Sequence, residues 1–473
     1  MTREVDVIVI GAGAVGENVA DYAHQGGLSV ALIEEELVGG ECSYWACMPS
    51  KALLRAGAVL ASARQVDGAK QAVTGAVDPA GVFRRRDALT HRFDDSSQVE
   101  WAEGAGLEVI RGHARITGER TVAITAPDGS TAELRARQAV VAATGSAALL
   151  PDIPGLADIA PWTSREATSA EQVPESLAVI GGGVVAAEMA TAYSSLGSRV
   201  TMIVRGGALL RGMEPFAADL VRSALEERGV TILDDELASA SRAGGRATLS
   251  LTSGATVVAE QVLVAIGRTP RTGDLGLEHA GLTPGDWLEV DDTLRVRGVD
   301  WLYGVGDVNH RALLTHQGKY QARAAGDAIA ARAAGRPLDT VPFGVHVATA
   351  DHEMVPQVTF TNPEIASVGF TEASARKAGR RIRVLDYDLS GVAGASTVSD
   401  DYVGRARAIV DEDRGVLIGA TFCGPEVGEM LQSATIAIVG EVPLHRLWHA
   451  VPAYPTLSEV WLRFLEAYGR PGR

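Results

Sequence analysis

The sequence predicts an α/β protein built from two parallel-sheet domains, followed by a third domain of the α+β class. Two observations predict the parallel sheets: a glycine-rich turn follows an apolar strand pattern near the start, and the pattern returns about 170 residues later. A third observation separates the last domain. Beyond residue 340, short strand patterns with turn signals replace the alternation of strands and helices, which is typical of an antiparallel sheet.

The first parallel-sheet pattern opens the chain. VDVIVI at 5–10 is an apolar, β-branched run typical of a buried strand, and GAGAVG and a helical pattern lead from it to a second strand ending at Glu34. Gly11, Gly13 and Gly16 have the spacing that lets a backbone approach a pyrophosphate at a helix N-terminus. Glu34 lies 18 residues after Gly16, where an acid can bind ribose hydroxyls. A tight turn beside a surface glutamate is the alternative.

The second copy of the pattern occupies residues 177–205. It carries Gly181 and Gly183 in the order GxGxxA, and its second strand is expected to end at Arg205, where the first copy has an acid. An arginine can pair with the 2′-phosphate of NADPH, and Arg211 follows six residues later. We therefore expect NADPH in preference to NADH. Two solvated surface arginines are the alternative.

Composition and charge exclude several classes of partner. The formal net charge of −16 disfavours nucleic acid, because a phosphate backbone attracts basic surfaces. We expect no membrane partner, since no apolar run approaches the roughly 20 residues that span a bilayer. The chain enters a strand pattern at once, without the features of a signal peptide. These observations predict a cytoplasmic location, where structural disulfides are rare.

A close pair of cysteines lies in GGECSYWACMPSK at 39–51, although the whole chain has only three cysteines. Three interpretations of Cys42 and Cys47 compete: a zinc site that needs two further ligands, a pair of inert buried thiols, or a redox-active disulfide. Residues five apart on a regular helix have Cα atoms roughly 8.5 Å apart, whereas a disulfide spans about 4.4–6.8 Å. A bridge therefore requires a turn or distorted first turn at 42–47, leading into a helix near Pro49.

These motifs resemble those of the flavin-dependent pyridine nucleotide–disulfide oxidoreductases, over essentially the whole chain. Residues 39–51 match the family pattern GGxCxxxxCxPSK, and GVGD at 304–307 matches its second flavin motif. ATG at 143–145 and GRTP at 267–270 resemble the segments that cross between domains, and FTNPEIASVGFTE at 360–372 resembles the opening of the dimerisation domain.

The resemblance implies a domain plan. Residues 1–150 and 268–340 would form a Rossmann-like FAD-binding domain, and residues 151–267 a second Rossmann-like domain that binds NAD(P)H. Residues 341–473 would form the dimerisation domain. The expected assembly is a homodimer acting on a small-molecule substrate, with FAD and NADPH as cofactors.

The resemblance also implies how electrons move. They would pass from NADPH to FAD and then to a Cys42–Cys47 disulfide, with Cys47 nearer the flavin and Cys42 as the interchange thiol. Lys51 would lie near the flavin and pair with Glu188. Two more cofactor-binding residues follow from the matched motifs: Gly145 and Asp307.

The C-terminal segment departs from the family pattern. In the disulfide reductases, HPTxxE supplies a histidine base from the partner subunit; here the stretch is YPTLSE, with Tyr454 in the histidine position and Glu459 retained. Histidine titrates near neutral pH, whereas an unperturbed tyrosine has a pKa of about 10. His445 and His449 lie nearby in the sequence; His449 is a candidate substitute base, and a structural or solvated histidine is the favoured interpretation.

The function expected from these features is NADPH-dependent reduction of a small disulfide or another thiol-reactive molecule through Cys42 and Cys47. The missing histidine favours one alternative, a quinone or metal-ion reductase in which electrons leave directly from the flavin. A redox-sensing flavoprotein with negligible turnover is the other alternative.

Overall fold

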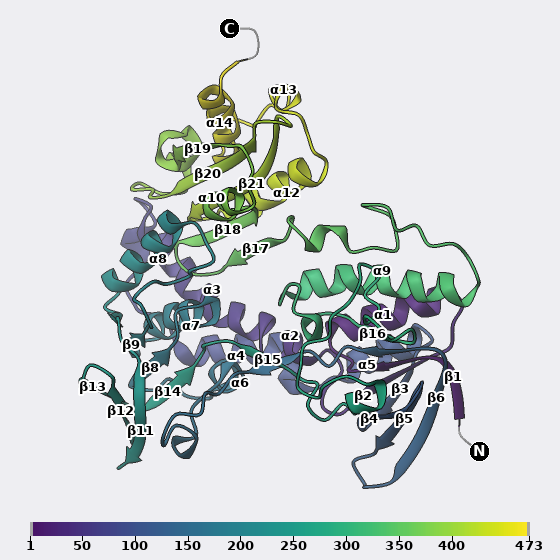
Figure 1. Cartoon of the computed structure of the whole chain (residues 1–473). Helices are drawn as coiled ribbons and strands as arrows, with labels where there is room; N and C mark the ends of the chain where they lie inside the picture. The colour runs from purple at the N-terminus through teal and green to yellow at the C-terminus, as the bar shows by residue number, and fades with distance from the viewer. Residues whose placement is uncertain (1–2, 471–473) are drawn as a thin grey trace. The chain divides into compact units, whose positions relative to one another are not determined.

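The computed structural model describes residues 3–470, which fold into two compact units. The first unit contains the chain up to Pro49, Asp87–Leu149 and Arg268–His352. The second contains Ser50–Arg86, Leu150–Gly267 and the chain from Glu353 onward. Figure 1 labels the elements of both units. The cofactor expected for each predicted domain stays a prediction.

A seven-stranded sheet forms the centre of the first unit, in the order β3-β2-β1-β6-β5-β4, with β16 added beside β6. Its parallel part is β3, β2, β1, β6 and β16, and its antiparallel part is the β4-β5-β6 meander. The strands are β1 (Arg3–Ile10), β2 (Val30–Glu34), β3 (Glu108–Arg111), β4 (His113–Gly118), β5 (Thr121–Thr125), β6 (Thr131–Ala142) and β16 (Leu302–Gly304).

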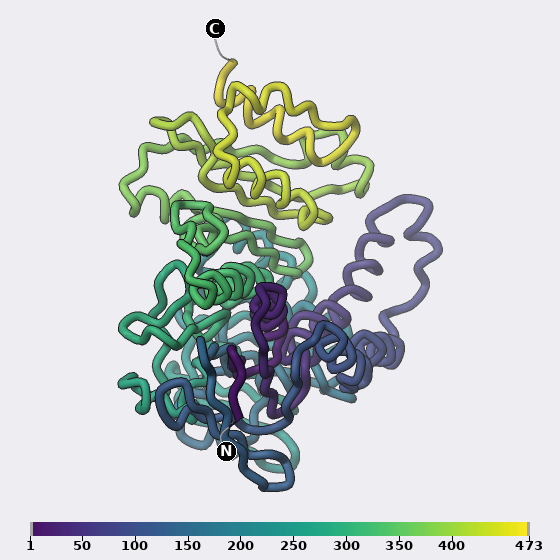
Figure 2. Tube along the Cα trace, turned by 90° about the vertical axis from the view of Figure 1, so that its right-hand side faces the viewer, coloured from purple at the N-terminus to yellow at the C-terminus, as the bar shows by residue number. Residues whose placement is uncertain are grey.

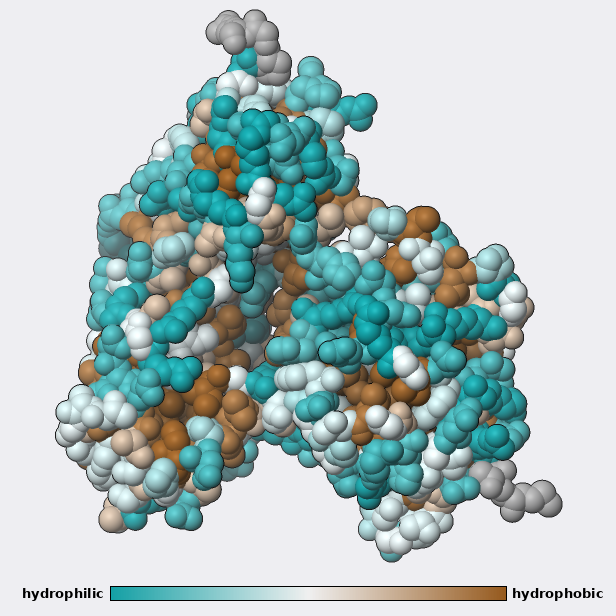
Figure 3. Space-filling view, in the orientation of Figure 1, coloured by the Kyte–Doolittle hydropathy of each residue, from teal (hydrophilic) through white to brown (hydrophobic). Residues whose placement is uncertain are grey.

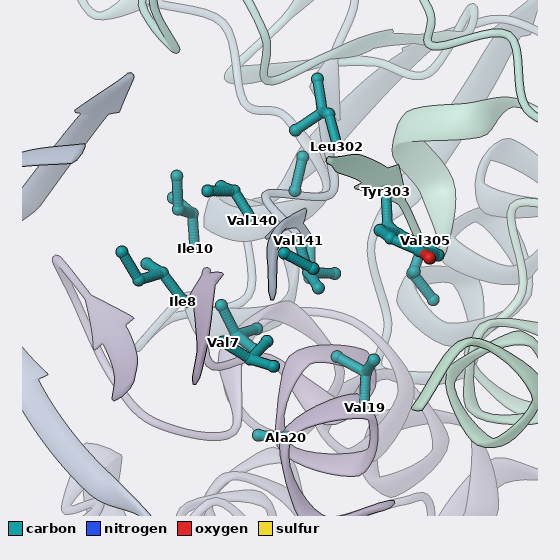
Figure 4. Close-up of a cluster of buried hydrophobic side chains, with 14 of the residues drawn as sticks. Val7, Ile8, Ile10, Val19, Ala20, Val140, Val141, Leu302, Tyr303 and Val305 are labelled. Atoms are coloured by element: carbon teal, nitrogen blue, oxygen red, sulfur yellow. The ribbon is translucent and has the colours of Figure 1, made fainter. Parts of the chain in front are cut away.

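The core of the first unit lies between this sheet and two helices, α1 (Ala14–Gln25) and α9 (Thr315–Ala333). Strand β1 is buried on both faces, as expected for a central parallel strand, and its side chains pack with those of β6 and β16 (Figure 4). Helices α1 and α9 pack side by side, which places the first turn of α1 next to the first turn of α9 (Figure 1). Two further α-helices lie wholly within this unit, α2 (Gly40–Tyr44) and α5 (Ser96–Gly104).

The second unit begins with a four-stranded parallel sheet in the order β10-β9-β8-β14. A three-stranded antiparallel sheet, β11-β12-β13, packs against its apolar side chains. The strands are β8 (Ser176–Ile180), β9 (Arg199–Ile203), β10 (Thr231–Leu233), β11 (Leu237–Ala243), β12 (Arg246–Leu251), β13 (Thr256–Ala259) and β14 (Gln261–Val264). The helices around them are α3 (Cys47–Arg64), α4 (Pro79–Leu89), α6 (Ser164–Ser169), α7 (Val184–Ser195) and α8 (Pro215–Glu227).

The C-terminal part of the second unit is an antiparallel sheet of five strands in the order β17-β18-β21-β20-β19, as the sequence predicts beyond residue 340. Helix α12 packs on β18 and β21, and α14 packs on β19 (Figures 1 and 2). The strands are β17 (Pro356–Thr359), β18 (Glu364–Gly369), β19 (Ile382–Asp388), β20 (Arg405–Asp411) and β21 (Val416–Gly424). The helices are α10 (Glu372–Lys377), α11 (Ala393–Val398), α12 (Leu431–Val439), α13 (Leu444–Leu447) and α14 (Val460–Tyr468).

Short connecting elements complete the chain. A two-stranded ladder pairs β7 (Ser146–Ala148) with β15 (Arg268–Pro270) in the first unit. Polar residues cover most of the face drawn in Figure 3, and hydrophobic residues show as scattered patches. Within residues 3–470, none of the helices has both the length and the apolar character needed to cross a bilayer.

Candidate active site

The glycine turn after β1 has the close contacts that a dinucleotide fold requires. Gly11 has a φ of +97°, and a Cβ there would lie 2.5 Å from the carbonyl oxygen of Ala143. A Cβ on Gly16 would lie only 1.8 Å from the carbonyl oxygen of Gly11. Gly13, by contrast, has only the Gly40 Cα atom near it, at 3.9 Å. The first and third glycines are thus needed for packing, and the second leaves the backbone open to a ligand.

Helix α1 begins directly after this turn. Its N-cap residue, Gly13, is extended and supplies no side-chain cap. The first N–H groups of a helix have no partner within the helix, and they favour an anion at that end. The start of α1 has the properties of a phosphate site, and the binding of a dinucleotide there stays a prediction.

Glu34 is more deeply integrated in the fold than the sequence indicates. It ends β2, is buried, and its carboxylate accepts hydrogen bonds from the Ala12 N–H at 2.7 Å and the Glu36 N–H at 2.8 Å. Burial raises the pKa of Glu34, whereas the two N–H groups act in the opposite direction. The acid is therefore held in place before any ribose binds.

Asp307 and Gly145 lie together in the first unit, and their joint role at a flavin nucleotide stays a prediction. The Asp307 carboxylate accepts a hydrogen bond of 2.5 Å from the Ser146 hydroxyl, and Arg268 lies 3.7 Å from it. Gly145 has a φ of +71°, and no atom lies within 4 Å of the position that a Cβ would take. Beside it, the buried Thr144 hydroxyl has no hydrogen-bond partner among the described residues. These features fit an FAD molecule, for which an unpartnered buried hydroxyl is a ready contact.

Cys42 and Cys47 come together across a break between two helices. Cys42 lies in α2, Cys47 begins α3, and the backbone leaves helical geometry at Trp45, which has φ −132° and ψ −1°. This is the distorted turn that the sequence predicts, although α3 begins two residues before Pro49. Neither cysteine forms a disulfide in this structure, and their side chains hydrogen-bond to each other. The redox-active bridge itself stays a prediction.

Thr315 is a contact of the thiol pair that sequence reasoning missed. Its hydroxyl lies 3.3 Å from the Cys47 sulfur, although the two residues are 268 positions apart. The hydrogen bond with Cys47 and then burial raise the pKa of the Cys42 thiol, while Thr315 and Lys319 lower it. Nothing in the local sequence around Thr315 marks it, because its role depends on where α9 packs.

Lys51 and Glu188 form the ion pair that the family resemblance implies. The Lys51 ammonium lies 2.9 Å from the carboxylate of Glu188, a residue of α7 that is 4% exposed. A third residue, Phe360, was not foreseen as part of this pair. Its N–H donates to Glu188 at 2.9 Å, and its ring lies 4.7 Å from the Lys51 ammonium. Phe360 thus fixes both members of the pair.

The second glycine turn follows the same plan as the first. A Cβ on Gly181, whose φ is +126°, would lie 2.3 Å from the Ala265 carbonyl oxygen, whereas Gly183 has nothing within 4 Å. Strand β9 ends at Ile203, two residues before the predicted end at Arg205, because the chain turns into a loop at Gly206. Arg205 and Arg211 are exposed, and the Arg211 guanidinium donates to the Arg205 carbonyl.

Tyr454 and Glu459 lie in the second unit, in the loop and short turn before α14. Tyr454 is 77% exposed. The Glu459 carboxylate accepts a hydrogen bond of 3.0 Å from the Gly394 N–H, so within its own chain it fastens this segment to α11. His445 and His449 are exposed on and just after α13. The roles at the thiols that the sequence suggests for Tyr454, Glu459 and His449 stay predictions.

Comparison with known proteins agrees with this geometry. Residues 5–329 match the model of the pyridine nucleotide-disulphide oxidoreductase family, and residues 355–463 match its dimerisation domain. A mercuric reductase of Staphylococcus aureus is 30% identical over 96% of this chain and 81% of its own length. A dihydrolipoyl dehydrogenase of Haloferax volcanii is 33% identical over 98% of this chain and 95% of its own.

Solved structures show the same fold. The Cu(II) complex of RclA, an HOCl-induced flavoprotein disulfide reductase of Escherichia coli, has a TM-score of 0.84 at 22% identity and covers 98% of this chain and 99% of its own. LpdA of Mycobacterium tuberculosis has a TM-score of 0.83 at 24% identity and covers 98% of this chain and all of its own. With two glycine turns, a close thiol pair and whole-length relatives, the chain belongs to the flavin-dependent pyridine nucleotide-disulfide oxidoreductase family.

Proposed function

We propose that this enzyme uses NADPH and FAD to reduce a small disulfide or another thiol-reactive molecule through Cys42 and Cys47. The observation that carries the proposal is the thiol pair, with Cys42 and Cys47 hydrogen-bonded to each other at a helix break in the unit that holds the first glycine turn. Bound FAD would supply two-electron transfer between the pyridine nucleotide and this sulfur pair.

The residues of the chain then have defined tasks. The start of α1, Glu34 and Asp307 would hold FAD, while Arg205 and Arg211 would bind the 2′-phosphate of NADPH. Thr315 can donate its hydroxyl hydrogen to Cys47 and so favour the thiolate nearer the flavin. Cys42 would attack the substrate. Lys51, fixed by Glu188, would lie near the flavin.

Anaerobic titration with NADPH tests the proposal. Reduction should produce a broad absorption band beyond the main flavin peak, because a Cys47 thiolate beside oxidised flavin forms a charge-transfer pair. The Cys47→Ser variant should lose this band, and Cys42→Ser should keep it while losing turnover. A band that survives in Cys47→Ser would contradict the assignment of the two thiols.

A second candidate is a quinone or metal-ion reductase that passes electrons directly from the flavin. The observation favouring it is Tyr454, an exposed tyrosine in place of the family's histidine base. A mercuric reductase among the relatives agrees with a metal-ion substrate. Full turnover of the Cys42→Ser variant with a quinone or a metal salt would favour this candidate.

We also propose that the enzyme is a homodimer in the cytoplasm. The C-terminal domain leaves Ile436, Val451 and Tyr454 exposed, and a cavity of about 550 Å³ lined by Ile436, Val451 and Trp461 lies in the same domain. Apolar surface of this kind supports burial against a second copy. Light scattering at micromolar concentration should give twice the chain mass of 49.4 kDa.

A further inference from the structure

A left-handed turn lies beside the cysteine segment in the first unit. His91, Arg92 and Phe93 have φ values of +50°, +56° and +61°, so three consecutive residues with side chains occupy the left-handed region. Such residues visit this region singly, because there the Cβ atom crowds a carbonyl oxygen. The surrounding structure must therefore hold the turn in place, and backbone strain of this kind concentrates near functional sites.

Backbone hydrogen bonds close the turn. The Phe93 N–H donates to the Thr90 carbonyl at 2.9 Å, and the Asp94 N–H donates to the His91 carbonyl at 3.1 Å. Thr90 is fully buried, so the turn starts from the interior of its unit. The turn is thus a fixed part of the fold and can act as a rigid support for what it contacts.

Phe93 is the residue through which the turn contacts the cysteine segment. The centroid of its ring lies 6.0 Å from that of Trp45 and 6.3 Å from that of Tyr44. The Tyr44 and Trp45 rings are themselves 5.7 Å apart in an edge-to-face arrangement. All three distances lie in the range where aromatic rings attract each other. Both partners of Phe93 lie between the two cysteines in the sequence, and Trp45 is the residue at which the helix breaks.

Asp95, two residues after Phe93, makes a second contact with the cysteine segment. Its carboxylate accepts a hydrogen bond of 2.7 Å from the Val38 N–H. The same carboxylate pairs with the Arg111 guanidinium of β3, which fixes its position. The two contacts lie on either side of Cys42 in the sequence, Asp95 with the chain before it and Phe93 with the chain after it.

We propose that Phe93 is a positioning residue, which holds Trp45 and through it the helix break that brings the two cysteines together. A fixed break keeps the two sulfurs close, so a bridge between them costs little further entropy. The left-handed turn supplies the rigid support for the Phe93 ring. The inference rests on the proposed function only for the use of the bridge in turnover.

Equilibration of the FAD-loaded enzyme with mixtures of reduced and oxidised dithiothreitol tests this support. Oxidised dithiothreitol takes two electrons and two protons from the two thiols, the Cys42–Cys47 bond forms, and reduced dithiothreitol is the product. Acid quenching, alkylation and mass spectrometry give the bridged fraction and hence the equilibrium constant of the bridge. We expect Phe93→Leu to lower this constant about threefold to tenfold, the scale of an aromatic contact, and Phe93→Tyr to stay within about twofold of the wild type.

A matched control and a double variant separate positioning from general packing. Phe343 is another phenylalanine of the first unit with a positive φ, +66°, but it is exposed and lies in a different loop. Phe343→Leu should leave the equilibrium constant within about twofold of the wild type. If Phe93 acts through Trp45, adding Phe93→Leu to Trp45→Leu should lower the constant by less than about twofold more, because effects that share one contact are not additive.

Three outcomes would overturn the proposal: Phe93→Leu matching Phe343→Leu, full additivity in the double variant, or a wild-type enzyme that forms no bridge. If Phe93→Leu does not retain FAD, Phe93→Met replaces it, with an expected decrease of about twofold to fivefold, because methionine keeps part of the contact with the rings. The measurement needs no NADPH turnover, so failure of the proposed function would appear separately, as turnover that survives in Cys42→Ser.

Discussion

The two glycine turns of this enzyme share a backbone plan but treat their charged residues differently. At the first turn, Glu34 is buried and its carboxylate is occupied by the N–H groups of Ala12 and Glu36. At the second, Arg205 lies beyond the end of β9 and is exposed. The first charge belongs to the folded core, whereas the second is free to respond to a ligand. If the second turn selects the pyridine nucleotide, as we propose, we expect that choice to be easier to change by mutation.

A second difference lies one residue beyond each turn. Helix α1 has Glu17 directly after Gly16, while α7 has Ala187 directly after Ala186, and both alanines are fully buried. The α7 start is thus an apolar packing surface, and the α1 start contains an acid whose charge depends on pH. The comparison shows that one backbone plan can support either a passive or a titrating helix start.

The largest expected effect comes from the third glycine of the first turn. Gly16→Ala would place a Cβ 1.8 Å from the Gly11 carbonyl oxygen, so the backbone must move. We expect a loss of about 3 kcal/mol or more in the free energy of unfolding, together with loss of bound flavin. Urea unfolding and the flavin absorbance of the purified protein measure both. Normal flavin content in Gly16→Ala would contradict the packing argument.

The next effect concerns Glu17 and pH. An acid whose pKa is raised in the folded state, here to about 7 against 4.5, stabilises the fold fully only below pH 4.5. Between pH 4.5 and 7 the unfolded chain releases its proton first, and about 3 kcal/mol of stability is lost. We expect Glu17→Gln to lack this loss, so its melting temperature should rise relative to the wild type as the pH increases. If the melting temperatures of Glu17→Gln and the wild type change in parallel between pH 4.5 and 7, the pKa of Glu17 is not raised in the folded state.

A smaller effect is expected at the arginines of the second turn. Arg205→Ala and Arg211→Ala should each lower kcat/KM for NADPH about tenfold, since a charged hydrogen bond to phosphate contributes about 1.5 kcal/mol. The value for NADH should stay within about twofold. Arg199→Ala is the matched control, because Arg199 is an exposed arginine on β9 paired with Glu175. Equal losses with both coenzymes would remove these arginines from 2′-phosphate recognition.

The smallest effect on stability is expected at Gly183. It has an extended backbone, with φ −81°, and no atom lies within 4 Å of the position that a Cβ would take, so alanine fits the fold. The free energy of unfolding should change by less than about 0.5 kcal/mol. KM for the pyridine nucleotide should nevertheless rise, because the added methyl group occupies the path of a phosphate. If Gly183→Ala loses as much stability as Gly16→Ala, the second glycine of a turn is as important for packing as the third, and our distinction between them is wrong.

Much of the fold can be predicted from the sequence, because its signals are local. The glycine spacing at Gly11 and Gly181 reports steric contacts between a strand and the next helix, and these depend on few neighbouring residues. The break between Cys42 and Cys47 also follows from local geometry, since a regular helix holds such residues too far apart for a bridge. The resemblance to a known family then implied the Lys51–Glu188 pair, which the structure contains.

The contacts that tune the thiols could not be predicted in this way. Thr315 lies 268 residues from Cys47, and Phe360 lies 172 residues from Glu188, so no spacing in the sequence relates them. The burial of Glu17 likewise depends on how α1 packs against α9. By itself the sequence determined the strands, the glycine turns and the position of the thiol pair, because short-range sterics govern them. Only the tertiary structure decided which charges and hydroxyls face the sulfurs, because packing between distant segments sets their distance and their exposure to water.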